Sequence, residues 1–101
     1  MLYTATVVVA EGELDVESLG PLRGRLERAA SAYDTVVLDA GGVSFADSSF
    51  LTLLLRTHQE TPVRVAAASA QVRRLLEITG ADQVLGLYPT VEEAMAAAGG
   101  S

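Results

Sequence analysis

Residues 35–40, with the sequence TVVLDA, restrict the fold of this chain more than any other segment. The run is short and nearly all apolar, which is typical of a strand that is buried on both faces. Strands of this kind belong to parallel sheets that are covered by helices. Runs at 3–10, 63–67 and 83–87 predict three further strands.

The segments between and after these runs carry apolar residues at helical spacing. They predict four helices, at about Ser18–Tyr33, Ser49–Gln59, Ser69–Thr79 and Thr90–Ala98. Ser18 and Ser69 are expected to act as N-caps, and Thr90 with Glu93 as a capping box. Gly12 is expected to end the first strand, so that the acidic residues around it form a solvated loop.

The predicted elements alternate between strand and helix along the whole chain, which indicates an α/β fold. The sheet is expected to be mostly parallel or mixed, with about four strands and four main helices. A length of 101 residues and a hydrophobic content of 50% suffice for one core but not for two. We therefore expect a single domain over residues 1–101, in which 98–101 form a disordered tail.

Charge and composition argue against several classes of function. The formal net charge is −6, and the seven basic residues are arginines scattered along the sequence, which argues against nucleic-acid binding. Cysteine is absent and the lone His58 is expected to be a structural or surface residue, so no disulfide, metal or cofactor is expected. No apolar run approaches the ~20 residues that cross a bilayer, and no secretory signal is recognised, so we expect a cytoplasmic protein.

A polar corner, Asp47-Ser48-Ser49, lies between the second predicted strand and the helix that follows it. A Ser or Asp side chain at this place can cap the helix. A phosphoserine would also be stabilised at a helix N-terminus, and the two roles are compatible. We do not expect an enzyme, because His58 lies too far along the helix to activate either serine and no phosphate-binding glycine motif is present.

Four motifs stand in order along the chain: 12–15 (GELD), 36–39 (VVLD), 43–49 (VSFADSS) and 72–80 (VRRLLEITG). In these motifs the sequence resembles STAS domains, and in particular the bacterial anti-sigma factor antagonists. The similarity extends from about Thr6 to Ala97, which is nearly the whole chain. It implies a single STAS-like α/β domain.

The resemblance also implies a role in transcription regulation. Antagonists of this family bind an anti-sigma factor that is also a serine-protein kinase, and phosphorylation at the N-terminus of the second helix ends the binding. By motif position the phosphate acceptor is Ser48, with Ser49 as the second choice. The partner-binding residues are Asp15, Asp47, Ser48, Ser49 and Phe50. The alternative is a STAS scaffold or transport-accessory module that binds its partner without phosphorylation.

The chain departs from the family pattern at two places. Phe50 stands where the family usually has glycine, and its ring could pack in the helix, anchor a partner or hinder a kinase. The family commonly has a further strand before the one that leads into GELD, and only residues 1–4 remain for it here. An unprotected sheet edge would favour pairing with a second chain, so a homodimer stays open.

Overall fold

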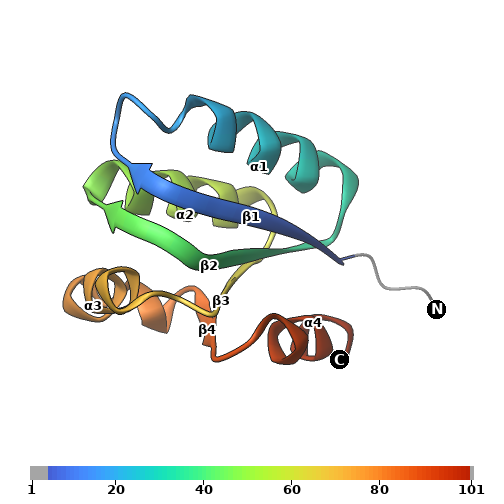
Figure 1. Ribbon diagram of the computed structural model, residues 1–101. Coiled ribbons are helices and arrows are strands. Elements are labelled where there is room, and N and C mark those ends of the chain that lie inside the picture. The colour runs from blue at the N-terminus through green and yellow to red at the C-terminus, as the bar shows by residue number, and fades with distance from the viewer. Residues whose placement is uncertain (1–4, 101) are drawn as a thin grey trace.

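The computed structural model describes residues 5–100, which form one four-stranded sheet with helices on both faces (Figure 1). The strands are β1 (Ala5–Leu14), β2 (Thr35–Ala46), β3 (Val63–Ala66) and β4 (Gly86–Tyr88). The helices are α1 (Gly20–Ala32), α2 (Ser48–Glu60), α3 (Ala70–Thr79) and α4 (Val91–Gly100), with a short 3₁₀ turn, η1 (Ala81–Gln83), before β4. The strand order is β1-β2-β3-β4 and every pair is parallel, which confirms the predicted α/β class.

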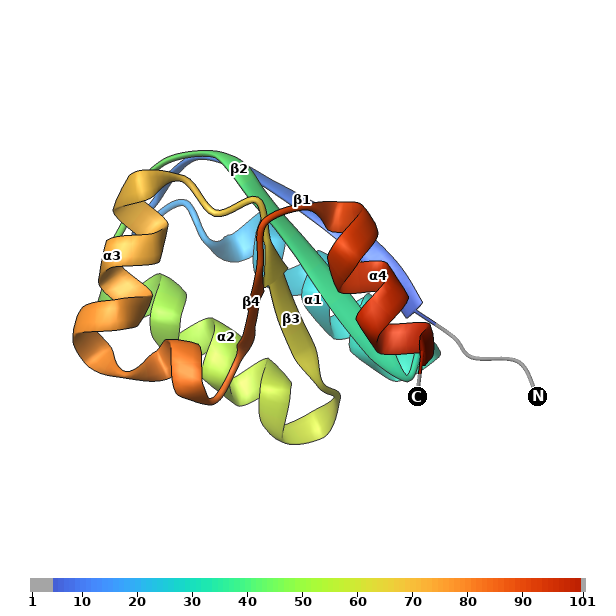
Figure 2. The ribbon, with the colours of Figure 1, turned by 90° about the horizontal axis from the view of Figure 1, so that it is seen from below.

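Two layers of helix cover the sheet. Buried side chains of α1, α2 and α3 pack in one large core against alternate residues of the strands, among them Leu38 and Val65. A second, smaller core lies on the opposite face, where Ala94 of α4 meets Val37 and Ala66 (Figure 2). Successive residues Val37 and Leu38 are therefore both fully buried, as expected for a central strand of a covered parallel sheet.

The first two strands are longer than the sequence predicted. Gly12, with φ of +80°, does not end β1 but lies at an irregularity of the β1–β2 ladder, and the strand continues to Leu14. Glu11 and Glu13 are thus exposed strand residues and not part of a loop. Strand β2 likewise continues past Gly41 and Gly42 to Ala46. Strands β1 and β2 satisfy each other's backbone hydrogen-bonding groups along this extension.

Local helix signals were confirmed at α3 and α4. Ser69 Oγ accepts the Val72 N–H at 3.4 Å, and Gly80 ends α3 with φ of +79°. Thr90 Oγ1 accepts the Glu93 N–H at 3.1 Å at the start of α4.

The predicted N-cap of α1 was wrong. Ser18 does not cap α1, which begins two residues later without a side-chain cap, because its hydroxyl bonds within the preceding loop. Helix α4 extends to Gly100 and so includes residues of the segment 98–101 that was expected to be a tail, while Ser101 lies outside the described residues. Residues 1–4 also lie outside them, and with them the question of the additional family strand.

Candidate functional site

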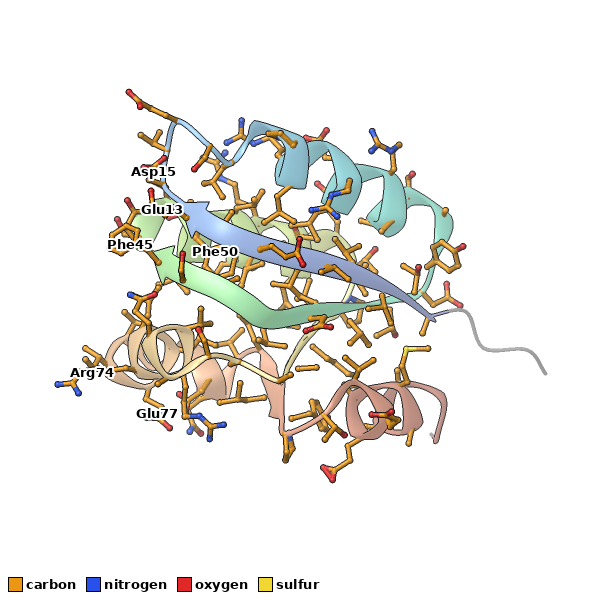
Figure 3. All side chains as sticks on the ribbon, viewed as in Figure 1. Glu13, Asp15, Phe45, Phe50, Arg74 and Glu77 are labelled. Carbon is orange, nitrogen blue, oxygen red and sulfur yellow. The ribbon has the colours of Figure 1, made fainter. Side chains whose placement is uncertain are left out.

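The candidate site lies where β1 and β2 end, at the carboxyl edge of the sheet. The parallel register pairs Leu14 with Ala46, so the next residues along the two strands are Asp15 and Asp47. One step earlier, Glu13 pairs with Phe45, and Figure 3 shows Glu13, Asp15 and Phe45 at the same end of the molecule. The structure therefore brings together two motifs that are far apart in the sequence. This edge is where α/β sheets commonly bind ligands and partners.

Asp47 is the N-cap of α2. Its backbone is extended, and Oδ1 accepts the Ser49 N–H at 2.9 Å, while its carbonyl oxygen accepts the N–H groups of Phe50 and Leu51. The cap is therefore the aspartate and neither of the serines, which resolves the alternatives that the sequence left open.

The two serines that follow Asp47 differ in exposure. Ser48 is the first residue of α2 and is exposed, whereas Ser49 is half-buried. Within the part of the chain that the structure describes, the Ser48 hydroxyl makes no hydrogen bond. Ser48 thus presents an accessible hydroxyl whose modification would not remove the cap.

Asp15 organises the loop between β1 and α1. Its Oδ1 accepts hydrogen bonds from the N–H groups of Glu17 and Ser18 at 3.0 and 3.1 Å, and the Ser18 hydroxyl lies at 2.9 Å. The hydrogen bond from the Ser18 side chain lowers the pKa of the Asp15 carboxyl below its ordinary value, with the backbone bonds acting in the same direction. Asp15 is therefore an ionised carboxylate, and the pairing of Leu14 with Ala46 places it near the α2 N-terminus.

Phe50 is not a surface residue. Its side chain is 0% exposed and belongs to the large core, which favours the packing role over a direct contact with a partner. Figure 3 labels its position beside Phe45. The ring is thus turned into the core, whereas Ser48 is exposed. The physical reason is the helical period, which places Phe50 with Leu53, Leu54 and Thr57 on the inward face of α2.

Two residues of the site were missed by the sequence analysis. Phe45 is 45% exposed at the end of β2, although phenylalanine is usually buried. Gln71, from the start of α3, accepts the Ala46 N–H through Oε1 at 2.8 Å and donates from Nε2 to the Ala46 carbonyl at 2.9 Å. These bonds hold the end of β2 directly before Asp47, and no local signal could have shown a contact across 25 residues.

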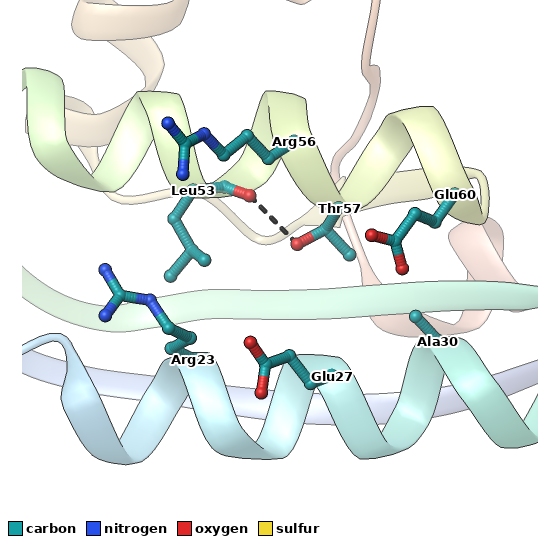
Figure 4. Close-up of a pocket in the computed structure, with 7 residues that line it drawn as sticks. All are labelled: Arg23, Glu27, Ala30, Leu53, Arg56, Thr57 and Glu60. Atoms are coloured by element: carbon teal, nitrogen blue, oxygen red, sulfur yellow. Dashed lines mark hydrogen bonds between the residues drawn. The ribbon is translucent and has the colours of Figure 1, made fainter.

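A groove between α1 and α2 extends from the serines. Its first hollow, of about 300 Å³, is lined by Val16, Leu19, Arg23, Ser48, Ser49, Thr52 and Arg56. The adjoining hollow, of about 210 Å³, is lined by Arg23, Glu27, Ala30, Leu53, Arg56, Thr57 and Glu60 (Figure 4). The two hollows share Arg23 and Arg56. These arginines lie far apart in the sequence, which gave no indication that they line one groove.

The remaining chemistry of the described residues is limited. His58 Nδ1 accepts the Val63 N–H at 3.0 Å, which confirms a structural role. In residues 5–100 no group of three or more His, Asp or Glu side chains is arranged to hold a metal ion. No helix within the same range has the length and apolar content needed to span a membrane.

Comparison with protein families identified a match over residues 3–89 to the model described as "Mlab, STAS domain". No match was found among curated proteins.

The solved structures that share this fold include the following four. An anti-sigma factor antagonist from Mycobacterium paratuberculosis is 30% identical, with a TM-score of 0.85, and the alignment covers 94% of this chain and 86% of that one. The anti-sigma factor antagonist SpoIIAA, in its unphosphorylated form, is 24% identical with a TM-score of 0.77 over 94% and 88% of the two chains. The Bacillus cell fate determinant SpoIIAA, in its phosphorylated form, is 24% identical with a TM-score of 0.69 over 93% and 90% of the two chains. The STAS domain of a SulP transporter from Vibrio cholerae is 21% identical, with a TM-score of 0.74 over 97% and 83%.

Proposed function

This chain belongs to the STAS domain family, and we propose that it is a cytoplasmic anti-sigma factor antagonist. Its partner is an anti-sigma factor that is also a serine-protein kinase, and the chain is the substrate of that kinase. The partner binds at the carboxyl edge of the sheet, over Asp15, Asp47, Ser48 and Ser49. Binding ends when the kinase transfers the γ-phosphoryl group of ATP to the Ser48 hydroxyl and releases ADP.

The observation that carries this proposal is the different placement of Asp47 and Ser48. Because Asp47 caps α2, the helix does not need the Ser48 hydroxyl, which is exposed to an incoming kinase. Ser49 is less accessible and its N–H is engaged by the cap. A phosphate on Ser48 would lie at a helix N-terminus, where negative charge is stabilised. The fold can therefore persist while the charge of the surface changes.

Electrostatics explains how this change would end binding. Phosphorylation adds roughly −1.5 to −2 charges next to Asp47, and Asp15 occupies the neighbouring strand end. A surface that buries against a partner then contains several anions, whose desolvation is costly. A loss of ~3 kcal/mol of binding free energy weakens an affinity by more than a hundredfold.

The same edge also offers apolar surface for a partner. Phe45 and Val16 are exposed large hydrophobic residues, the first at the end of β2 and the second beside the serines in the α1–α2 groove. Exposed aromatic side chains of this kind are common anchors of protein interfaces. Phe45 is thus proposed as an aromatic anchor of the partner surface.

A direct test incubates the protein with the anti-sigma kinases of its own genome and ATP, and locates the phosphate by mass spectrometry. We expect phosphate on Ser48 and a complex that forms with the unmodified protein. Ser48→Ala should bind persistently and Ser48→Asp weakly, with Ser49→Ala as the matched control that is still phosphorylated. A protein that forms no complex and receives no phosphate at either serine would contradict the proposal.

The alternative is a STAS module that binds a partner constitutively, as a scaffold or transport accessory. The SulP transporter domain shares its fold, but at 21% identity this likeness extends only to the fold. A bulky residue at position 50 favours this alternative, and the burial of the Phe50 ring weakens that support. A partner that binds Ser48→Ala and Ser48→Asp with equal affinity would favour the constitutive module.

A homodimer through the edge of the sheet is a further proposal. Over residues 5–100, β1 pairs only with β2 and carries exposed Val7 and Val9. Edge strands with unpaired backbone groups can pair with a second chain. Sedimentation that shows a strict monomer at high protein concentration would exclude it.

A further inference from the structure

The groove beside Ser48 has polar walls on both helices. On α2, Ser48, Thr52 and Arg56 recur at every fourth position and so share one face of the helix. On α1, Arg23 and Glu27 have the same spacing and face them across the groove. The hollow next to Ser48 is therefore lined by hydroxyl groups and by two arginines.

Both guanidinium groups lack partners within the described residues. Neither the Arg23 nor the Arg56 side chain forms an ion pair or a hydrogen bond there, although Glu27 and Glu60 line the adjoining hollow. Figure 4 shows both guanidinium groups extending toward the N-terminal ends of their helices, which is the direction of Ser48 on α2. The groove thus presents two unpaired positive charges next to the hydroxyl that we propose as the phosphate acceptor.

We propose that Arg23 and Arg56 form an intramolecular clamp for the phosphoryl group on Ser48. The clamp rests on the proposed function, because it needs Ser48 to be modified. Eight residues of helix separate Ser48 from Arg56, or ~12 Å along the axis, and the extended Arg56 side chain shortens this distance. Ser48, Arg23 and Arg56 line the same hollow. A guanidinium group binds a phosphate through two parallel N–H donors, and two such groups match its charge of nearly −2.

The clamp gives phosphorylation a second effect on the partner surface. In the unmodified protein Arg23 and Arg56 are available to acidic groups of a partner. In the phosphorylated protein they are engaged by the phosphate, so the surface loses two cations while it gains an anion. The phosphate is also held against α1 and α2, where it blocks the groove.

Phosphoserine incorporated during translation at position 48 provides the test, with the second pKa of the phosphate followed by ³¹P NMR. Groups that bear on this titration are Asp47 at the cap, Asp15 on the adjacent loop, Glu27 in the groove and the two arginines. We expect the phosphate pKa to lie below its usual value of about 6, and to rise by ~0.5 or more in Arg23→Gln/Arg56→Gln. The double variant Arg25→Gln/Arg28→Gln removes the same charge from exposed positions of α1 and should leave the titration unchanged.

Equal titration curves for the phosphoserine protein and its Arg23→Gln/Arg56→Gln variant would overturn the clamp. So would an equal shift in the Arg25→Gln/Arg28→Gln control, since the effect would then be one of net charge. Arg23→Lys/Arg56→Lys keeps the charges without the planar fork, and we expect an intermediate pKa. Inorganic phosphate added to the unmodified protein is the second probe. If Arg23→Gln/Arg56→Gln changes the ³¹P signal of inorganic phosphate but not that of the phosphoserine, the arginines bind free phosphate and the clamp is excluded. The phosphoserine is introduced during translation, so this titration does not depend on a kinase. Failure of a kinase to modify Ser48 would contradict the proposed function and leave the outcome of the titration unchanged.

Discussion

The side-chain amide of Gln71 makes both backbone hydrogen bonds of Ala46, accepting from its N–H and donating to its carbonyl oxygen. A strand residue usually obtains these two bonds from a neighbouring strand, but β3 ends too early to supply them. The first turn of α3 therefore stabilises the end of β2, and with it the position of Asp47 and Ser48.

Replacement of Gln71 by alanine should destabilise this corner. It leaves the N–H and carbonyl groups of Ala46 without these partners, at a cost of about 1–3 kcal/mol in the free energy of unfolding. Urea denaturation measures the loss, and hydrogen exchange at the Ala46 amide should accelerate in parallel. Unchanged protection of that amide would show that the Gln71 bonds do not hold the strand end.

Replacement of Asp47 by alanine removes the cap of α2. We expect a loss of ~0.5–2 kcal/mol in the free energy of unfolding, because the Ser49 N–H loses its acceptor. Asp47→Asn keeps a side-chain oxygen at the same place and should preserve most of the stability. If denaturation finds the alanine and asparagine variants equally stable, one of the serines can replace the cap.

The two phenylalanines should respond in opposite ways. Phe50→Gly restores the residue usual in the family but removes a fully buried ring, and should destabilise the fold by at least ~3–5 kcal/mol. Phe45→Ala should change stability by less than about 1 kcal/mol and weaken partner binding about tenfold or more. Thermal melts and binding isotherms measure the two effects. A Phe45→Ala protein with full affinity would remove this residue from the partner surface.

Gly86 in β4 has no room for a larger residue. A Cβ atom at this position would lie 2.7 Å from Cε1 of Tyr88, whose hydroxyl accepts a hydrogen bond from Arg64. Gly86→Ala should therefore displace the Tyr88 ring and cost ~1–3 kcal/mol in unfolding free energy. Gly20→Ala is the matched control, because nothing lies within 4 Å of that Cβ position. Equal melting temperatures for the two variants would contradict the packing of Tyr88 over Gly86.

The lowered pKa of Asp15 predicts that the stability of the fold depends on pH in the acidic range. Hydrogen bonds, above all from the Ser18 hydroxyl, lower it from the ordinary 3.8, so ionised Asp15 stabilises the fold above pH 3.8. That contribution is lost as the pH falls through the lowered pKa of the folded state. NMR titration should find the Asp15 pKa closer to its ordinary value in Ser18→Ala. An unchanged Asp15 pKa in that variant would exclude the Ser18 hydroxyl as the main cause.

Local sequence determined the elements and their order. The apolar run at 35–40 indicated a central strand, and β2 is buried there on both faces. Ser69 and Gly80 marked the ends of α3 correctly, because a cap and a left-handed stop depend on interactions within a few residues. The family motifs likewise placed Ser48 at the start of α2.

Tertiary structure decided which side chains form the site. Phe50 was buried and Phe45 exposed by the packing of α2 against the sheet, and residue type alone does not reveal this difference. The extension of β1 past Gly12 depends on pairing with β2, about thirty residues further along the chain. Gln71 reaches Ala46, and Arg23 faces Arg56, only because helices from separate parts of the chain pack side by side. Contacts of this kind depend on the long-range arrangement of the elements, which the local sequence pattern does not encode.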